Sequence, residues 1–403
     1  MARYLRRIAG GLLALIAAIL LTACNSVTAP PPDDTQIVTI GFIDELVGDA
    51  SGPGQGARNS AELAIRQAND ANAVPGYRLE LVAGHAEKPE EGAALTTKFA
   101  ADPRMVGLIG ASSSTVSRAT IPILAQKDIV QISFSNTNPA LSLGPYPTQA
   151  PHRVFSNFFR VVANDLLQGQ FAASYARDRP GVRTVATVND QKPYGLGLVA
   201  AFEREFTNRN GKVVSSRFVK EDDIAGIKSV ARKIAAQNPE LVYYAGEYEE
   251  GSKLLVQLRA AGYKHPMMAG DTLYREDMLA FGHDAEGLFA TSVGAPLEQL
   301  KSAKQFIADY HAAHFPKPYS TYGGQSYDAT NILIRALAEV LPRSASVAEA
   351  RPRIIDAVGR TSNFQGSTGP QTFDQFGDTT NKALTMYKIT GGKWGSIYST
   401  VYE

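Results

Sequence analysis

Hydrophobic and polar residues are grouped along the first third of the chain in blocks that predict strands followed by helices. Residues 37–43 (IVTIGFI) are almost continuously apolar, which is typical of a strand buried on both faces of a sheet. A helical pattern follows over residues 59–72, after a glycine-rich turn at 48–56. The succession continues with predicted strands at 78–82, 105–109 and 129–133 and predicted helices at 89–102 and 117–126. Strands alternating with helices of this length predict βαβ units and a parallel sheet.

The alternation starts again after a stretch without clear periodicity, and this predicts a second sheet. Predicted strands lie at 183–188, 212–219, 241–245 and 266–269, and predicted helices lie at 195–208, 224–237 and 249–261. Two separate series of this kind predict an α/β protein with two doubly wound lobes.

The last quarter of the chain predicts two helices and a pair of strands. Helices at 302–314 and 326–341 have no strands of their own, so we expect them to cover the first sheet. Residues 371–374 and 383–390 are expected to form a strand pair around the turn Gly377-Asp378.

The amino-terminal end has a different pattern, in which arginines precede an apolar run. Arg3, Arg6 and Arg7 are followed by the run 8–21 and by the tetrapeptide Leu21-Thr22-Ala23-Cys24. A charged start, a short apolar centre and small residues before the cut are the marks of an export signal. The run of 14 residues is shorter than the roughly 20 that span a bilayer. The tetrapeptide resembles the bacterial lipobox, whose cysteine is lipidated and becomes the first residue of the mature protein.

Cys24 is the only cysteine of the chain, which favours a thiol reserved for lipid. The alternative is an ordinary signal peptide in which the cysteine stands by chance. We therefore expect a signal peptide at 1–23, a lipid on Cys24 and a Pro- and Asp-rich linker at 24–36. This places the protein at the cell membrane, on its extracytoplasmic face, in a periplasm or at an outer cell surface.

Composition and charge exclude several classes of function. Three of the 40 basic residues precede Cys24, so the mature chain has 37 basic against 39 acidic residues. Such a balance gives no electrostatic signature for nucleic acid. A content of 44% apolar and 20% charged residues is that of a folded globular protein. A single cysteine excludes a disulfide within the chain.

Two polar loops follow neighbouring strands of the first series. Residues 110–115 (GASSST) come after one strand and before a helix, and Ser135-Asn-Thr137 follows the next strand. Hydroxyl groups and free N–H groups at a helix start attract a carboxylate, although a plain helix-capping run has the same composition. Because open α/β sheets bind ligands at the carboxyl ends of their strands, we expect a carboxylate site there.

At this point the chain resembles the leucine/isoleucine/valine-binding proteins, which are type I periplasmic binding proteins. The resemblance covers essentially the whole mature chain in order and at near-constant spacing, through residues 112–115 (SSST), 132–139 (ISFSNTNP), 189–195 (NDQKPYG), 241–246 (LVYYAG), 268–271 (MAGD), 285–287 (AEG) and 369–374 (GPQTFD). It implies two Rossmann-like lobes joined by three crossovers, with an N-terminal lobe at 37–156 and 293–370 and a C-terminal lobe at 157–292 and 371–403. It also implies that the lobes close on a ligand, which the protein then delivers to an ABC permease.

The resemblance further implies a set of ligand-binding residues. Ser114, with Thr115 beside it, matches the hydroxyl that takes the ligand carboxylate, and Ser135 and Thr137 match the second donor loop. Tyr194 matches an aromatic residue that closes over the ligand. Asp271 takes the place of the acid that pairs with the α-ammonium, and Tyr322 that of an aromatic against the ligand side chain. A free amino acid would complement donors, acid and aromatics together.

The chain departs from the family in two places. The glycine-rich turn Gly52-Pro-Gly-Gln-Gly56 has no aromatic residue, and Glu247 stands where an aromatic is expected, with Tyr248 next to it. Either Glu247 lies near the ligand and favours a cationic or amide-bearing one, or it points outward and Tyr248 takes the aromatic role.

Signals for other chemistry are weak. Residues 195–200 (GLGLVA) match a relaxed dinucleotide fingerprint, but about six residues separate them from the strand, so close helix packing is the better interpretation. His311 and His314 have no acidic or cysteine partner at ligand spacing, and no G-x-S-x-G motif occurs. We therefore expect no cofactor, no metal and no catalysis.

The predicted function is capture of a branched-chain-like amino acid, or of a related small zwitterion or amide, by a monomer that delivers it to an ABC permease. The alternative from another class is a sensory receptor of the same fold that signals through a membrane partner. The absence of a fused signalling region favours transport.

Overall fold

The computed structural model describes residues 35–48 and 51–402, and it contains two large β-sheets. The predicted signal peptide, Cys24 and all but the last two residues of the linker lie outside the described residues. The first sheet has the order β2-β1-β3-β4-β5, and the pairs β1/β3, β3/β4 and β4/β5 are parallel. Its strands are β1 (Gln36–Asp44), β2 (Tyr77–His85), β3 (Met105–Gly110), β4 (Val130–Ser133) and β5 (Phe158–Arg160).

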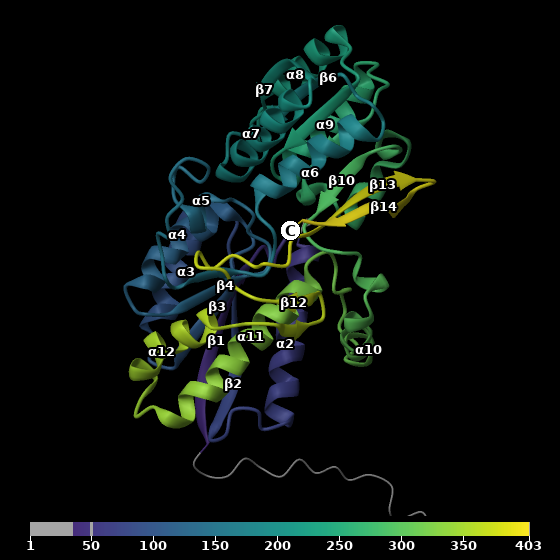
Figure 1. Ribbon diagram of the computed structural model, residues 1–403. Helices are drawn as coiled ribbons and strands as arrows, with labels where there is room; N and C mark the ends of the chain where they lie inside the picture. The colour runs from purple at the N-terminus through teal and green to yellow at the C-terminus, as the bar shows by residue number, and fades with distance from the viewer. Residues whose placement is uncertain (1–34, 49–50, 403) are drawn as a thin grey trace, which may run out of the picture. The chain divides into compact units, whose positions relative to one another are not determined.

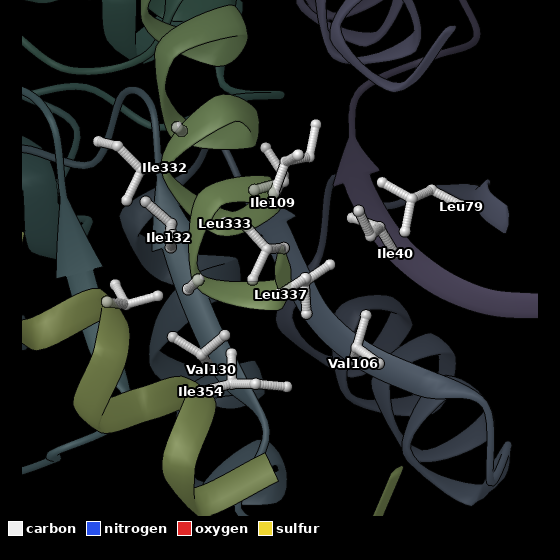
Figure 2. Packing of buried hydrophobic residues seen from close by; sticks show 14 of the residues in the cluster. Ile40, Leu79, Val106, Ile109, Val130, Ile132, Ile332, Leu333, Leu337 and Ile354 are labelled. Atoms are coloured by element: carbon white, nitrogen blue, oxygen red, sulfur yellow. The ribbon is translucent and has the colours of Figure 1, made fainter. Parts of the chain in front are cut away.

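Helices cover both faces of the first sheet, because its strands carry apolar side chains on both sides. One face packs against α2 (Gly52–Asp70), α11 (Gly323–Val340) and α12 (Val347–Gly359), and Figure 2 shows Leu333 and Leu337 of α11 among the strand residues Ile109, Val130 and Ile132. The other face packs against α3 (Pro89–Ala101) and α4 (Ser114–Ala125). These elements, with the short α5 (Ala140–Leu143), make up what we call the first lobe.

The second sheet has the order β14-β13-β10-β9-β8-β6-β7 and is mixed. The strands β7, β6, β8, β9 and β10 are parallel to their neighbours, whereas β13 pairs antiparallel with β10 and with β14. The strands are β6 (Thr184–Asn189), β7 (Lys212–Phe218), β8 (Leu241–Ala245), β9 (Met267–Ala269), β10 (Phe289–Ser292), β13 (Ala383–Thr390) and β14 (Lys393–Val401). The helices α6 (Asp165–Asp178) and α7 (Pro193–Asn208) pack on one face, and α8 (Ile224–Gln237) and α9 (Tyr248–Ala260) on the other; with the sheet they form the second lobe (Figure 1).

The parallel strands of the two sheets have the same order. In chain order, each lobe arranges its first five strands as 2-1-3-4-5, which is a doubly wound topology. The chain passes between the lobes three times, after β5, after β10 and before β13. The predicted fold class, two doubly wound lobes joined by three crossovers, is therefore confirmed. Its physical consequence is a switch point in each lobe, between β1 and β3 and between β6 and β8, where adjacent loops part and leave a crevice.

The predicted glycine-rich turn at 48–56 is wrong in its second half, because α2 already begins at Gly52. Pro53 fits the first turn of a helix, where its missing N–H has no partner to lose. Gly54 and Gly56 serve close packing: an added Cβ would lie 2.1 Å from the carbonyl oxygen of Glu45 and 2.4 Å from that of Pro318.

The predicted strand pair near the carboxyl end is also wrong. The strand β13 pairs with β14 across Gly391 and Gly392, whose φ angles of 60° and 72° suit a tight hairpin turn. The strand β12 (Gly369–Gln371) pairs instead with β11 (Phe364–Gly366) in a separate two-stranded sheet.

Of the two helices expected to cover the first sheet, only α11 does so. The helix α10 (Lys304–Ala312) packs through Phe306 and Tyr310 against Leu63 on the outer side of α2. The strand β5 extends the first sheet to Arg160, four residues beyond the expected lobe boundary at 156. Single-turn and 3₁₀ segments connect the remaining elements, at η1 (Asp271–Leu273), η2 (Glu276–Ala285), η3 (Leu297–Gln299), η4 (Lys301–Ala303) and η5 (Leu341–Arg343).

Candidate functional site

A cavity of about 350 Å³ lies where the carboxyl ends of the parallel strands of both lobes meet. Loops after β1, β3 and β4 line it from the first lobe, and loops after β6, β8 and β9 line it from the second. All nine residues predicted for the site line this cavity, namely Ser114, Thr115, Ser135, Thr137, Tyr194, Glu247, Tyr248, Asp271 and Tyr322. The structure thus brings the whole predicted set together from positions up to 208 residues apart in sequence.

The amino terminus of α4 supplies hydrogen-bond donors on the first-lobe side. The helix begins at Ser114, three residues earlier than predicted, and Ser113 caps it by accepting the N–H of Thr115 at 3.2 Å. The Thr115 hydroxyl is buried and has no hydrogen-bond partner among the described residues. Free N–H groups and an unpartnered hydroxyl at a helix start, where the helix dipole is positive, favour an anionic group in the cavity.

The loop after β4 forms a second wall beside α4, and a buried arginine holds it. Arg160, fully buried at the end of β5, donates to the carbonyl oxygens of Asn136 at 3.2 Å and Asn138 at 2.8 Å and pairs with Asp378 at 2.7 Å. The Ser135 hydroxyl donates to the carbonyl of Ser112 at 3.1 Å, which ties this loop to the start of α4. The two donor loops are therefore fixed relative to each other before any ligand arrives.

Asp271 is the central acid of the cavity and is only 3% exposed. Its carboxylate accepts hydrogen bonds from the Tyr194 hydroxyl at 2.8 Å, from Gln168 Nε2 at 2.6 Å and from the Tyr322 hydroxyl. Tyr194 and Gln168 belong to the second lobe, whereas Tyr322 precedes α11 in the first lobe. All three partners are neutral donors, so the negative charge of Asp271 is hydrogen-bonded but has no cation opposite it among the described residues.

Two glycines allow the second-lobe side of the site to assemble. A Cβ on Gly270 would lie 2.1 Å from the Tyr194 hydroxyl oxygen, so only glycine lets this tyrosine reach Asp271. A Cβ on Gly195 would lie 2.5 Å from the carbonyl oxygen of Ala245, which confirms the close-packing interpretation of residues 195–200.

Both Glu247 and Tyr248 line the cavity. Glu247 precedes α9, and its N–H donates to Asp190 at 2.9 Å. Burial raises the pKa of the Glu247 carboxyl to about 8, and repulsion from Asp190 adds to this effect. The positive charge of Lys192 acts in the opposite direction and lowers the pKa. The ring of Tyr248 lies under the Arg275 guanidinium, 4.1 Å from its centre.

Sequence reasoning missed several residues of the cavity, among them Asp44, Glu45, Glu249 and Arg275. The Ser112 hydroxyl donates to Asp44 at the β1/β3 switch point, and burial raises the pKa of Asp44 to about 6. Asp44 and Glu45 come directly after an apolar strand, so the argument that identified Ser112 to Thr115 would have identified them too.

A family model described as periplasmic binding protein matches residues 37–393. The chain belongs to the periplasmic binding protein family. Members of this family bind substrates outside the cytoplasm rather than convert them. The described part of this binding protein contains no helix long and apolar enough to cross a membrane, and no group of three or more side chains there is arranged to hold a metal ion.

Several relatives of this binding protein are named for the amino acids they bind. It is 26% identical over 360 residues to the Leu/Ile/Val-binding protein BraC3 of Rhizobium johnstonii, covering 88% of this chain and 92% of the relative. It is 25% identical over 349 residues to the leucine-, isoleucine-, valine-, threonine- and alanine-binding protein of Pseudomonas aeruginosa, with coverages of 85% and 88%.

Solved structures share the fold of this binding protein at lower identity. The leucine binding protein LivK of Thermotoga maritima superposes with a TM-score of 0.77 at 24% identity, covering 90% of this chain and 98% of that one. A solute binding protein from R. palustris in complex with benzoate superposes with a TM-score of 0.76 at 20% identity, with coverages of 90% and 96%. The same fold therefore holds ligands of quite different chemistry.

The raised carboxyl pKa values predict that the unliganded protein loses stability as the pH rises. In the unfolded chain Glu247 titrates near 4.5, whereas in the folded protein it keeps its proton up to about pH 8. The folded state therefore binds more protons between these values, so the free energy of unfolding falls as the pH rises through this window. Removing the group with Glu247→Gln should raise the melting temperature at pH 8.5 by about 2 °C or more and leave it nearly unchanged at pH 4.5.

Calorimetric melting of the unliganded protein at the two pH values measures this difference. Glu339→Gln is the matched control, because Glu339 is exposed on α11 and pairs with Arg360 away from the cavity. A melting temperature for Glu247→Gln that stays at or below the wild-type value at pH 8.5 would contradict the burial of an uncompensated carboxyl.

Proposed function

We propose that this protein captures a small zwitterion, an amino acid or a close analogue, in the cavity between its lobes and delivers it to an ABC permease. The proposal rests on one observation: the same cavity contains a group that favours an anion and a group that favours a cation. The start of α4, with Ser114 and Thr115, favours an anion from the first lobe, and Asp271 favours a cation from the second. An α-amino acid presents both charges on one carbon.

The buried position of Asp271 makes the ammonium group a strong requirement. Its three partners, Tyr194, Gln168 and Tyr322, satisfy its hydrogen-bonding capacity but leave its charge without a counterion. A carboxylate removed from water needs an opposite charge, and an ammonium group in the cavity supplies it. Neutral ligands would leave this charge as it is.

The mechanism that fits this arrangement is closure of two lobes around the ligand. We take the N-terminal lobe as 37–160 and 293–370 and the C-terminal lobe as 161–292 and 371–403, which shifts the first boundary to the end of β5. Closure excludes water from the cavity and so strengthens the pairing of Asp271 with the ammonium group. No covalent step is part of the proposal.

Relatives support an amino acid as the ligand class, since several are named for leucine, isoleucine and valine. The benzoate-binding neighbour shows that the fold alone does not require an ammonium group. Support for a zwitterion in this chain therefore comes from Asp271 and the α4 terminus rather than from the fold.

We further propose that the protein is anchored by a lipid on Cys24 after removal of residues 1–23, with 24–36 as a flexible linker. The Leu21-Thr22-Ala23-Cys24 motif and the single cysteine support this. A tether keeps a loaded monomer close to its permease in the membrane, whereas an untethered one diffuses away.

A thermal-shift screen of the purified protein against amino acids, amides and small carboxylates tests the proposed function. A true ligand at 100 times its dissociation constant should add about 2.7 kcal/mol of stability. With the best ligand, Asp271→Asn should weaken binding by about 3 kcal/mol, roughly 150-fold, because the buried ammonium loses its counterion. Calorimetry measures this change, and Asp356→Asn, at an exposed position of α12, is the control. Unchanged affinity in Asp271→Asn would remove Asp271 from the site.

The anchor is tested by Cys24→Ser, which should move the protein from the membrane fraction to the soluble fraction, because a serine cannot carry the thioether-linked lipid. Fractionation followed by immunoblotting measures the distribution. A variant that stays with the membrane would contradict lipidation at Cys24.

A further inference from the structure

More acidic than basic side chains line the cavity, an imbalance that a simple zwitterion would not change. Seven carboxyl groups line it, namely those of Asp44, Glu45, Glu87, Glu221, Glu247, Glu249 and Asp271. Three cationic side chains line it as well, those of Lys88, Lys192 and Arg275. The carboxylate and ammonium of an amino acid cancel each other, so the excess remains when such a ligand binds.

The two partly buried cations of the lining already have acidic partners. Lys192 Nζ lies 3.0 Å from the fully buried Glu250 and 3.4 Å from Glu221. Arg275 pairs with Asp277 at 2.6 Å and stacks on Tyr248. Both positive charges are thus compensated within the second lobe.

Three glutamates of the lining, by contrast, form no direct ion pair. The carboxyl groups of Glu45, Glu247 and Glu249 make no ion pair and no hydrogen bond to another side chain among the described residues, although the Glu247 N–H donates to Asp190. Burial and repulsion from Glu249 raise the pKa of Glu45 to about 7. Glu45 belongs to the first lobe and Glu249 to the second, so this repulsion acts between the lobes. The two lobes therefore present acidic groups to each other across the cavity. Arg275 attracts both Glu45 and Glu249 but offsets this repulsion only in part, since the pKa of Glu45 stays raised. A further cation between them would lower the free-energy cost of bringing the lobes closer.

The rest of the lining suits an organic cation better than an aliphatic side chain. Among the residues that the structure describes, no leucine, isoleucine, valine, methionine or phenylalanine lines the cavity. Its larger apolar surfaces are the rings of four tyrosines, Tyr194, Tyr248, Tyr274 and Tyr322. Aromatic faces attract cations, and the stacking of Arg275 on Tyr248 is an example inside this cavity. A branched aliphatic group there would remove water from the glutamates without supplying a hydrogen bond or a positive charge in its place.

We propose that the ligand carries a second positive charge at its side-chain end, as a basic amino acid does, and that this charge lies between Glu45 of the first lobe and Glu247 and Glu249 of the second. This inference rests on the proposed function, in which Asp271 and the α4 terminus hold the amino-acid head. The second cation then removes the repulsion between the lobes, so it contributes to closure as well as to selectivity.

Calorimetric titration of the purified protein with matched ligands tests this inference. L-norleucine is L-lysine without its terminal amine, so the pair isolates the second charge; L-ornithine and L-arginine vary its reach, and L-leucine and L-glutamate complete the panel. The best basic amino acid should bind about tenfold or more tighter than norleucine and leucine, and glutamate should bind weakest. Glu247→Gln should weaken binding of the basic ligand about tenfold and change norleucine binding less than about twofold.

Glu45→Gln is the second variant, on the other lobe and with the same expected result, so that the test survives if one variant fails to fold. The control Glu339→Gln, at an exposed position of α11, should leave the affinity for both the basic ligand and norleucine unchanged. Norleucine or leucine binding as tightly as every basic amino acid would overturn the inference and leave the proposed function intact. Equal losses for both ligands in Glu247→Gln would also overturn it. Titration with 1,5-diaminopentane separates the two proposals. Binding of this diamine but of no amino acid would contradict the proposed zwitterion while keeping the second charge, and binding of neither would contradict both.

Discussion

The carboxylate of Asp271 is the interaction on which the rest of the site depends. It is buried at the carboxyl end of β9, and donors from α6, from α7 and from the residue before α11 converge on it. One of these donors, Tyr322, belongs to the opposite lobe, so this carboxylate also links the two lobes. Neutral donors fix its position without cancelling its charge, and the proposal of an ammonium group as its partner rests on this combination.

In both lobes an acidic side chain holds a loop in place at the switch point of the sheet. At the β1/β3 switch point the Ser112 hydroxyl donates to Asp44, and at the β6/β8 switch point the Glu247 N–H donates to Asp190. In each lobe, an acid at the end of the first strand in sequence, β1 or β6, fixes the loop that follows the third strand in sequence, β3 or β8. The crevices that doubly wound sheets leave at these points become one cavity because the two lobes present them to each other. The acids that hold these loops also place carboxyl groups in the cavity, and the proposed preference for a cationic ligand rests on them.

Much of this arrangement could be predicted from the sequence, because it depends on local patterns. The two α/β series, the donor run at the start of α4 and the acid after β9 all follow from strand–loop–helix succession and from the family resemblance. The sequence did not predict the three-residue strand β5 or the hairpin turn at Gly391-Gly392, because such short elements carry little periodic signal. Gln168 escaped for a different reason: it meets Asp271 across 103 residues of sequence, and only the packing of α6 on the second sheet brings them together. Whether Glu247 faces the cavity likewise depends on the direction in which α9 leaves β8.

A crystal structure of the protein with its tightest-binding amino acid shows whether Asp271 pairs with the ammonium group. We expect a ligand enclosed between the lobes, with its ammonium nitrogen about 3 Å from a carboxylate oxygen of Asp271 and its carboxylate at the N–H and hydroxyl groups of Ser114 and Thr115. A ligand bound outside this cavity, or inside it with no contact between its ammonium group and Asp271, would overturn the proposed site.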